Sequence, residues 1–194
     1  MVETELKFRL AGEEELARLE ALLGKPLLLR QLSSHYWIPG SPPHASLRLR
    51  EVDGAAELTV KRGGAPPVDG LHVREEVSER IDAGLAVALL CGEVSPAELP
   101  LVHRTGLAAP FHDAGRLLTE RRTFRAGILP VETDRVLFPD GSRDWEVEVE
   151  APEAAALRGA LLELARRAGV ALVPSRDTKL QRLLARQDPA GATP

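Results

Sequence analysis

Val2-Glu3-Thr4-Glu5-Leu6-Lys7-Phe8-Arg9-Leu10 is the stretch of sequence that decides the fold. Successive side chains of a β-strand point to opposite faces, so these residues predict a strand with one apolar face and one charged face. The apolar face carries Val2, Thr4, Leu6, Phe8 and Leu10, and the charged face carries Glu3, Glu5, Lys7 and Arg9. A polar face that only meets water tolerates almost any polar residue. Acids and bases in sorted order indicate instead a site that binds a metal through carboxylates and an anion through cations.

The same division into an apolar face and a charged face recurs in later predicted strands. Two of these strands, residues 45–52 and 55–62, flank Asp53-Gly54, which is a strong hairpin signal. For a single strand, the simpler interpretation is an outer face in contact with solvent. Like charges two residues apart repel one another, however, so the sorted set favours a closed sheet with an ionic interior. The later charged faces carry Arg48, Arg50, Lys61, Arg74, Glu76, Glu132, Asp134, Glu146, Glu148 and Glu150.

The order of predicted elements is typical of an α+β protein with a mainly antiparallel sheet. We expect strands at 2–10, 27–38, 45–52, 55–62, 71–81, 116–126, 129–138 and 143–151. We expect helices at 13–23, 152–168 and 176–186, and one or two more within 82–107 with a break near Ser95-Pro96. If the sheet closes into an eight-stranded antiparallel barrel, amphipathic helices cover its apolar outside and the charged faces line a polar tunnel. We expect one domain over residues 1–187 and a disordered tail at 188–194.

Composition narrows the functional class. The chain has 194 residues, 44% of them hydrophobic and 28% charged, which is enough to form a substantial core. A formal net charge of −4 argues against broad binding of nucleic acid, which requires a basic surface. The single cysteine, Cys91, excludes a disulfide framework, and we expect it to be a buried helix residue. No apolar run approaches the roughly 20 residues that span a bilayer, and no signal peptide is visible, so we expect a cytoplasmic protein.

The residue types in the predicted tunnel indicate its ligand. Arginine binds phosphate oxygens in pairs, lysine acts as a point charge, and carboxylates are hard ligands for Mg²⁺ or Mn²⁺. Cations beside paired carboxylates therefore predict a chain of phosphates bridged by a divalent metal. The five histidines show no ligand spacing, which disfavours zinc, and the sequence has no phosphate-binding loop of the P-loop type.

The charged motifs resemble the CYTH superfamily, also called triphosphate tunnel metalloenzymes. Glu3, Glu5 and Lys7 match its N-terminal Glu-x-Glu-x-Lys strand, and further matches follow in order as far as residue 182. These matches are Arg48 and Arg50, Leu58-Thr59-Val60-Lys61, Arg74-Glu75-Glu76, Glu120-Arg121-Arg122, Asp134, Glu146-Val147-Glu148 and Thr178-Lys179-Leu180-Gln181-Arg182. Glu120 departs from the pattern because it stands where a base is usual, so either Arg121 or Arg122 could be the inward base.

The resemblance implies roles for individual residues. The metal ligands would be Glu3, Glu5, Glu76, Asp134, Glu146 and Glu148, and the catalytic residues Glu5, Lys7 and Glu146. The phosphates would be held by Lys7, Arg9, Arg48, Arg50, Lys61, Arg74, Arg122, Lys179 and Arg182. The metal would be Mg²⁺ or Mn²⁺ and the partner a small-molecule triphosphate or polyphosphate. We expect no nucleic-acid or membrane partner, and a homodimer is the candidate assembly.

Three functions remain open from the sequence. The first is metal-dependent hydrolysis of an inorganic or organic triphosphate, such as thiamine triphosphate or a nucleoside triphosphate. The second is the class IV adenylate cyclase reaction, which the low aromatic content of 4% disfavours because it offers no obvious platform for a base. The third is a noncatalytic polyphosphate- or nucleotide-binding module, which could dispense with the acidic residues that this chain retains.

Overall fold

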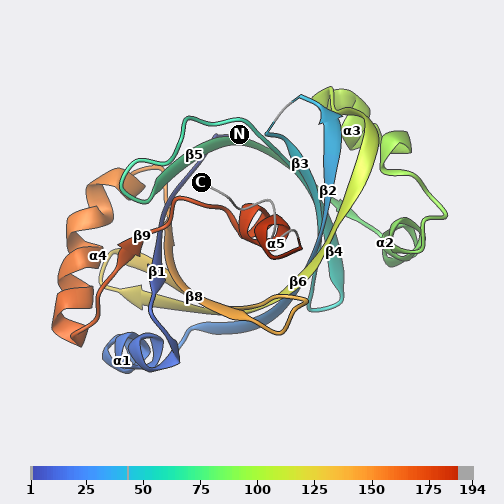
Figure 1. Ribbon diagram of the computed structural model, residues 1–194. Coiled ribbons are helices and arrows are strands. Elements are labelled where there is room, and N and C mark those ends of the chain that lie inside the picture. Colours follow the sequence, from blue (N-terminus) through green and yellow to red (C-terminus); the bar gives the residue numbers. More distant parts are fainter. Residues whose placement is uncertain (1, 43, 188–194) are drawn as a thin grey trace.

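The computed structural model describes residues 2–42 and 44–187 and shows a closed antiparallel β-barrel (Figure 1). The strands follow one another around the barrel in the order β5-β4-β3-β2-β6-β7-β8-β1, and β1 pairs again with β5 to close the ring. The eight barrel strands are β1 (Val2–Leu10), β2 (Leu28–Ser41), β3 (Ser46–Val52), β4 (Ala55–Arg62), β5 (Leu71–Ile81), β6 (Ala108–Ala126), β7 (Leu129–Leu137) and β8 (Arg143–Glu150). The predicted eight-stranded antiparallel barrel is therefore confirmed.

Five α-helices and one 3-10 helix accompany the strands within the described residues. They are α1 (Glu13–Leu23), α2 (Ala83–Leu90), the 3-10 helix η1 (Pro96–Glu98), α3 (Pro100–Thr105), α4 (Ala154–Ala168) and α5 (Lys179–Gln187). None of these helices is long and apolar enough to cross a membrane. The predicted disordered tail at 188–194 lies outside the described residues.

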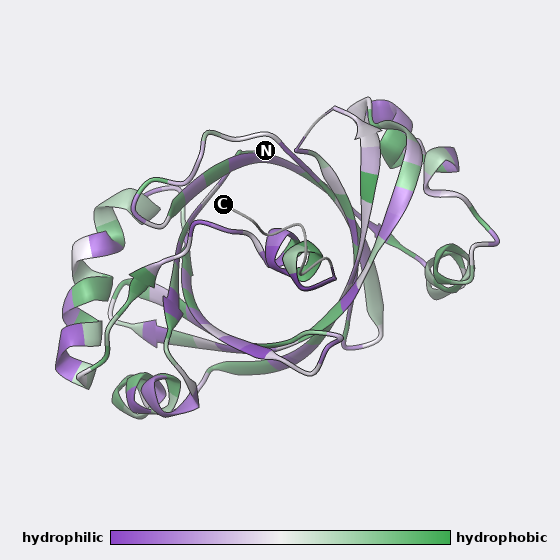
Figure 2. Cartoon of the chain, in the orientation of Figure 1, coloured by the Kyte–Doolittle hydropathy of each residue, from purple (hydrophilic) through white to green (hydrophobic). Residues whose placement is uncertain are grey.

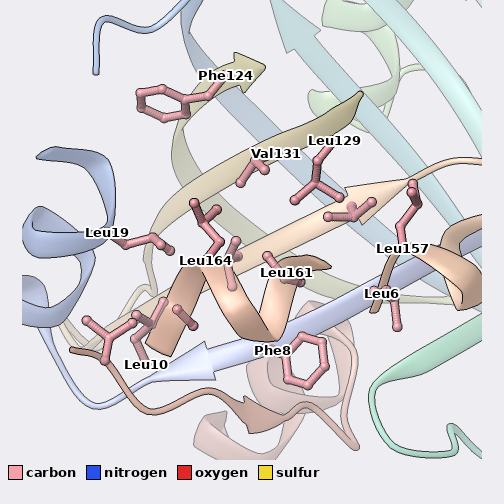
Figure 3. Close-up of a cluster of buried hydrophobic side chains, with 14 of the residues drawn as sticks. Leu6, Phe8, Leu10, Leu19, Phe124, Leu129, Val131, Leu157, Leu161 and Leu164 are labelled. Carbon is pink, nitrogen blue, oxygen red and sulfur yellow. The ribbon is translucent and has the colours of Figure 1, made fainter. Parts of the chain in front are cut away.

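Alternation along the strands gives the barrel its apolar outside and its charged inside, and Figure 2 shows hydrophilic and hydrophobic residues following one another along the strands. On β1, Leu6 and Phe8 are 0% and 1% exposed and belong to the largest hydrophobic cluster outside the barrel. Helices α1 and α4 cover this part of the barrel. Figure 3 shows Leu157, Leu161 and Leu164 of α4 packed among side chains from β1 and β7.

The sequence of α4 explains why this helix packs over the hydrophobic cluster. Leu157, Leu161 and Leu164 recur at the spacing of a single helical face, so they all meet the barrel while Arg166 and Arg167 end the helix in solvent. Gly169 follows with a φ of +66°, a left-handed conformation that glycine adopts without strain and that turns the chain back toward the barrel.

A second hydrophobic cluster forms where α2, η1 and α3 cover the outside of β3 and β4. Leu47, Leu49, Leu58 and Val60 are at most 1% exposed, and they pack against leucines and valines from residues 86–107. The interruption predicted near Ser95-Pro96 is observed there, because Ser95 caps η1 and the chain then enters α3 at Pro100. Cys91, which we expected to be buried, ends α2 and is exposed, so that prediction is wrong.

Helix α5 lies within the outline of the barrel, whereas α1 to α4 lie around it (Figure 1). Its Leu183 is 0% exposed and packs against inward-facing residues of β2, β6 and β7, including Tyr36, Leu117 and Val136. The chain reaches α5 through a short strand, β9 (Val173–Pro174), which pairs with β1. One end of the barrel interior is therefore a small apolar core around α5, and the remainder is left for charged side chains.

Candidate functional site

A cavity of about 850 Å³ occupies the barrel interior. Its walls are built from the charged faces of β1, β3, β4, β5 and β8, with contributions from α5. The lining side chains that the sequence predicted for the site are Glu3, Glu5, Lys7, Arg48, Arg50, Lys61, Arg74, Glu76, Glu148 and Lys179. Most of the predicted site residues are thus brought together around one space.

Carboxylates gather on one wall of this interior. Asp134 of β7 and Glu146 and Glu148 of β8 are at most 3% exposed, and one oxygen from each lies within 4.8 Å of the others. The pairing of β7 with β8 places Asp134 directly opposite Glu146. Three oxygen donors at this separation fit a hard divalent cation such as Mg²⁺ or Mn²⁺.

Basic side chains from α5 and β6 neutralise this acidic group. Lys179 Nζ lies 2.5 Å from Glu146 Oε2, 2.7 Å from Glu148 Oε1 and 2.9 Å from Asp134 Oδ2. Arg121 binds both oxygens of Asp134, with Nε at 2.8 Å and Nη2 at 2.6 Å. A cation entering the carboxylate group would therefore compete with Lys179 and Arg121 for the same oxygens.

The pKa values of Glu148 and Glu5 indicate that these two buried carboxylates are ionised. Burial alone would raise the pKa of Glu148, but Lys179, Lys7 and Arg121 hold it well below its usual value. Burial likewise opposes ionisation of Glu5, yet Lys7, 3.0 Å away, lowers the pKa of Glu5 to about 2. Both side chains carry full negative charge at neutral pH and are ready to bind a metal without losing a proton.

Cations with fewer carboxylate partners occupy the opposite wall. Arg48 and Arg50 of β3 point inward, and Arg50 Nε donates to Ser34 Oγ at 3.4 Å. Arg50 forms no ion pair with a carboxylate of the described chain. Arg48 Nη2 donates to Thr59 Oγ1 at 3.1 Å and lies 3.9 Å from Glu76 Oε1, while its buried Nε has no hydrogen-bond partner among the described residues. Burial, reinforced by Arg48, lowers the pKa of Arg50 to about 10. Two neighbouring guanidinium groups that line a cavity and hold little carboxylate charge between them are a favourable site for an anion.

Two further groups connect the acidic and basic walls. Lys61 of β4 lies 2.7 Å from Glu3 Oε2 and 2.9 Å from Glu76 Oε2, so these carboxylates share one lysine. Arg74 of β5 donates from Nη2 to Nδ1 of His72 at 2.7 Å. The charge of the cavity lining therefore changes from negative near β8, where carboxylates predominate, to positive near β3, where arginines predominate.

The expectation that Arg122 contributes the inward base of β6 is wrong. Arg122 lies outside the barrel, where Nη1 donates to Glu20 Oε2 of α1 at 2.8 Å and Nη2 to Glu120 Oε1 at 2.9 Å. Alternation along β6 then points Arg121 inward, and Arg121 lines the cavity. One residue of register therefore decides which arginine joins the site.

Two other predicted phosphate ligands lie apart from the cavity lining. Arg9 is bound to Asp144 Oδ1 at 3.1 Å and its side chain is 43% exposed, so it sits beyond the site on the same face of β1. Arg182 is buried and pairs with Glu146 and, through Nε at 2.7 Å, with Asp144 Oδ2. The structure places both arginines around Asp144, a residue that the sequence analysis did not select.

Other inward residues also escaped the sequence analysis. His72 is 1% exposed, and Tyr36, at 7%, lines the cavity beside the arginines. Burial lowers the pKa of His72 to about 4, reinforced by Lys7, so its ring is neutral. Strand alternation would have placed His72 on the same face as Arg74, but a lone histidine carries no signal that separates it from a solvent-exposed one.

The chain is similar to one known protein family and to several solved structures. A model of the CYTH domain matches residues 1–182. A putative adenylyl cyclase from Hippeastrum, whose structure is described as revealing a dominant triphosphatase activity, is 21% identical, with 95% of this chain and 96% of that chain covered and a TM-score of 0.82. A putative adenylate cyclase from Bacillus halodurans is 21% identical, with coverage of 93% and 97% and a TM-score of 0.72.

The likeness of fold extends to an archaeal protein. The PH1012 protein from Pyrococcus horikoshii is 19% identical, with 92% of this chain and 98% of that chain covered and a TM-score of 0.61. No curated protein sequence is a significant match to this chain.

Proposed function

The chain belongs to the CYTH domain family, and from this premise we propose that it hydrolyses triphosphates in the barrel cavity with the help of a divalent metal ion. One observation supports this proposal above the others. The interior places Arg48 and Arg50 opposite a group of buried carboxylates, and this arrangement complements a phosphate chain that carries a metal. The dominant triphosphatase activity described for the Hippeastrum protein agrees with this choice.

The basic wall would bind and align the substrate. Arg48 and Arg50 can each present two N–H groups to phosphate oxygens, while Lys61 and Arg74 add charge along the cavity. Because these cations approach from several strands, they would hold the phosphate chain in one orientation and neutralise the charge that repels an attacking nucleophile.

The acidic wall would hold the metal. Glu5, Asp134, Glu146 and Glu148 are buried carboxylates, and their oxygen donors suit Mg²⁺ or Mn²⁺. When bound, such an ion would withdraw charge from the phosphate oxygens in the transition state. Glu3 of β1 and Glu76 of β5 lie nearer the cations, joined through Lys61, and would complete the set of carboxylates.

Glu5, which lines the cavity, would orient the attacking water. Its pKa of about 2 makes it a weak base, so its contribution is to accept a hydrogen bond from the attacking water rather than to remove a proton completely. Lys7, hydrogen-bonded to Glu5 at 3.0 Å, would keep that carboxylate ionised and stabilise negative charge beside it.

A phosphate-release screen tests the proposal. Inorganic triphosphate, thiamine triphosphate, ATP and long polyphosphate are each incubated with Mg²⁺, with Mn²⁺, or with EDTA, and cyclic AMP is measured in parallel. We expect phosphate release from at least one triphosphate that requires metal and stops with EDTA. Formation of cyclic AMP and pyrophosphate from ATP, or no phosphate release under any condition, would contradict hydrolysis.

Arg50→Ala is expected to raise the KM for inorganic triphosphate about 10- to 100-fold, because it removes a charged hydrogen-bonding group from the anion site. Arg166→Ala, which removes an arginine from the exposed surface of α4, is the matched control and should leave KM unchanged. An unchanged KM in Arg50→Ala would exclude Arg50 from substrate binding.

The pH dependence of binding provides a second check on Arg50. Its folded-state pKa of about 10 lies below the ordinary value for arginine, so the fold disfavours the charged form. This group therefore costs stability below about pH 10, and that cost decreases as the pH rises from about 10 toward the higher pKa of the unfolded chain. Substrate binding has the opposite sign: the affinity for inorganic triphosphate should be steady below about pH 9 and fall as Arg50 loses its charge. Arg50→Ala should remove this alkaline loss.

A further inference from the structure

His72 occupies an unusual position between the cavity and the C-terminal segment. It belongs to β5, faces the barrel interior and is 1% exposed. Its two ring nitrogens contact different parts of the chain: Nδ1 meets Nη2 of Arg74 at 2.7 Å, and Nε2 meets the backbone carbonyl of Ser175 at 3.0 Å. His72 therefore connects Arg74 with Ser175, which are 101 positions apart in the sequence.

The chemistry of the two partners determines the state of the ring. A carbonyl oxygen can only accept a hydrogen bond, so Nε2 of His72 must carry the proton and donate to Ser175. A guanidinium group can only donate, so Nδ1 must present its lone pair to Arg74. Neither the opposite tautomer nor the doubly protonated ring can satisfy both contacts.

Ser175 provides a firm support for this arrangement. Its backbone N–H donates to the carbonyl of Lys7 at 3.0 Å, and its hydroxyl accepts from Nη1 of Arg182 at 3.3 Å. Arg182 in turn pairs with Glu146. The segment before α5 thus fixes the imidazole through the hydrogen bond to Ser175, and the lone pair of Nδ1 points toward Arg74.

Arg74 lines the cavity, and His72 is the hydrogen-bond partner that the structure gives its guanidinium group. An arginine side chain has several rotatable bonds, and ordering it on binding costs affinity. A fixed acceptor at one N–H therefore leaves the remaining N–H groups oriented for a ligand before it arrives.

We propose that His72 is a positioning residue that orients Arg74 for binding a triphosphate, acting as a neutral imidazole anchored on the Ser175 carbonyl. This inference rests on the proposed function, because it assigns Arg74 to the substrate. It separates His72 from the residues that contact the ligand, and it gives the segment before α5 a part in substrate affinity.

A pair of substitutions separates the two hydrogen bonds of His72. The oxygen of an asparagine side chain can take the place of Nδ1, so His72→Asn keeps an acceptor for Arg74 and loses the bond to Ser175. The amide nitrogen of a glutamine side chain can take the place of Nε2, so His72→Gln keeps the donor to Ser175 and loses the acceptor. His103→Gln, at an exposed position in α3, is the matched control.

Kinetics with inorganic triphosphate and Mg²⁺ then distinguish positioning from a purely structural role. We expect His72→Gln to raise KM about tenfold while kcat stays within about twofold, and His72→Asn to raise KM by no more than about twofold. In an Arg74→Ala background, His72→Gln should have no further effect on KM. Equal KM values for His72→Gln and the parent, or additive effects in the double variant, would overturn the proposal.

A spectroscopic measurement tests the inference independently of activity. In the ¹⁵N NMR spectrum of the unsubstituted protein, His72 should show a protonated Nε2 and an unprotonated Nδ1 at neutral pH, and Arg74→Ala should shift the Nδ1 resonance. A protonated Nδ1 would overturn the positioning role. If the protein proves unable to hydrolyse or bind triphosphate, the proposed function fails, and the NMR result still decides whether His72 holds Arg74.

Discussion

Glu148→Gln is expected to lower kcat/KM for triphosphate hydrolysis about 10²- to 10³-fold, because this carboxylate stands where the predicted metal ligands and the catalytic cations meet. Glu148 Oε1 lies 3.2 Å from Nζ of Lys7 and 2.7 Å from Nζ of Lys179, while Oε2 lies 2.5 Å from Nη2 of Arg121. Glutamine keeps the size of the side chain and removes its charge, so it weakens the metal site and also releases three cations that Glu148 aligns.

The measurements for Glu148→Gln need to separate chemistry from folding. Removing a buried acid leaves basic neighbours less compensated, so some loss of thermal stability is expected as well. Circular dichroism should show a folded protein at the assay temperature, and a metal titration should show that more Mg²⁺ or Mn²⁺ is needed for half-maximal rate. Glu163→Gln, on the exposed side of α4, is the control. Parental activity in Glu148→Gln would remove this residue from the site.

Phe8→Ala is expected to lower the free energy of unfolding by about 3–5 kcal/mol, the range for deleting a buried aromatic side chain. Phe8 is 1% exposed in the cluster between β1, α1 and α4. Gly70, with a φ of +83°, passes so close that a Cβ there would lie 3.3 Å from the Phe8 ring, so the pocket around the ring is closely packed.

Urea unfolding of Phe8→Ala provides the measurement, and Val2→Ala is its matched control. Val2 lies on the same face of the same strand but is 62% exposed, so its truncation should change the stability by no more than about 0.5 kcal/mol. Equal losses in the two variants would mean that the apolar face of β1 is not packed as described.

The sequence was most informative where a periodic pattern extended over a whole element. The alternation in β1 correctly separated Leu6 and Phe8, which face the outer helices, from Glu5 and Lys7, which face the cavity. Strand alternation could not decide between Arg121 and Arg122, because with two adjacent arginines one of them faces inward in either register. Glu20 on α1 resolves the ambiguity because it binds Arg122 from outside the barrel. Arg122 and Glu20 are 102 positions apart, so no local sequence pattern could have predicted their contact.

Other differences arise from tertiary contacts as well. Strand β6 begins at Ala108 rather than near Arg116, because its first half pairs with the long β2 despite containing Pro110 and Gly115. The amphipathic pattern of α5 predicts a helix with an apolar face, but an apolar face can pack inside a barrel as readily as outside it. Its position inside is what brings Lys179 to the acidic wall.

The closure of the barrel at β1 has a consequence for how the chain folds as it is made. β1 leaves the ribosome before the other barrel strands, yet it pairs along one edge with β5 and along the other with β8, about 140 residues later. Until β8 and α4 have been synthesised, the apolar face of β1 cannot form its native packing contacts. Such a delay leaves the nascent chain prone to aggregation. Efficient production should therefore depend on shielding β1 during translation, so co-expression of a chaperone that binds nascent chains is expected to raise the soluble yield.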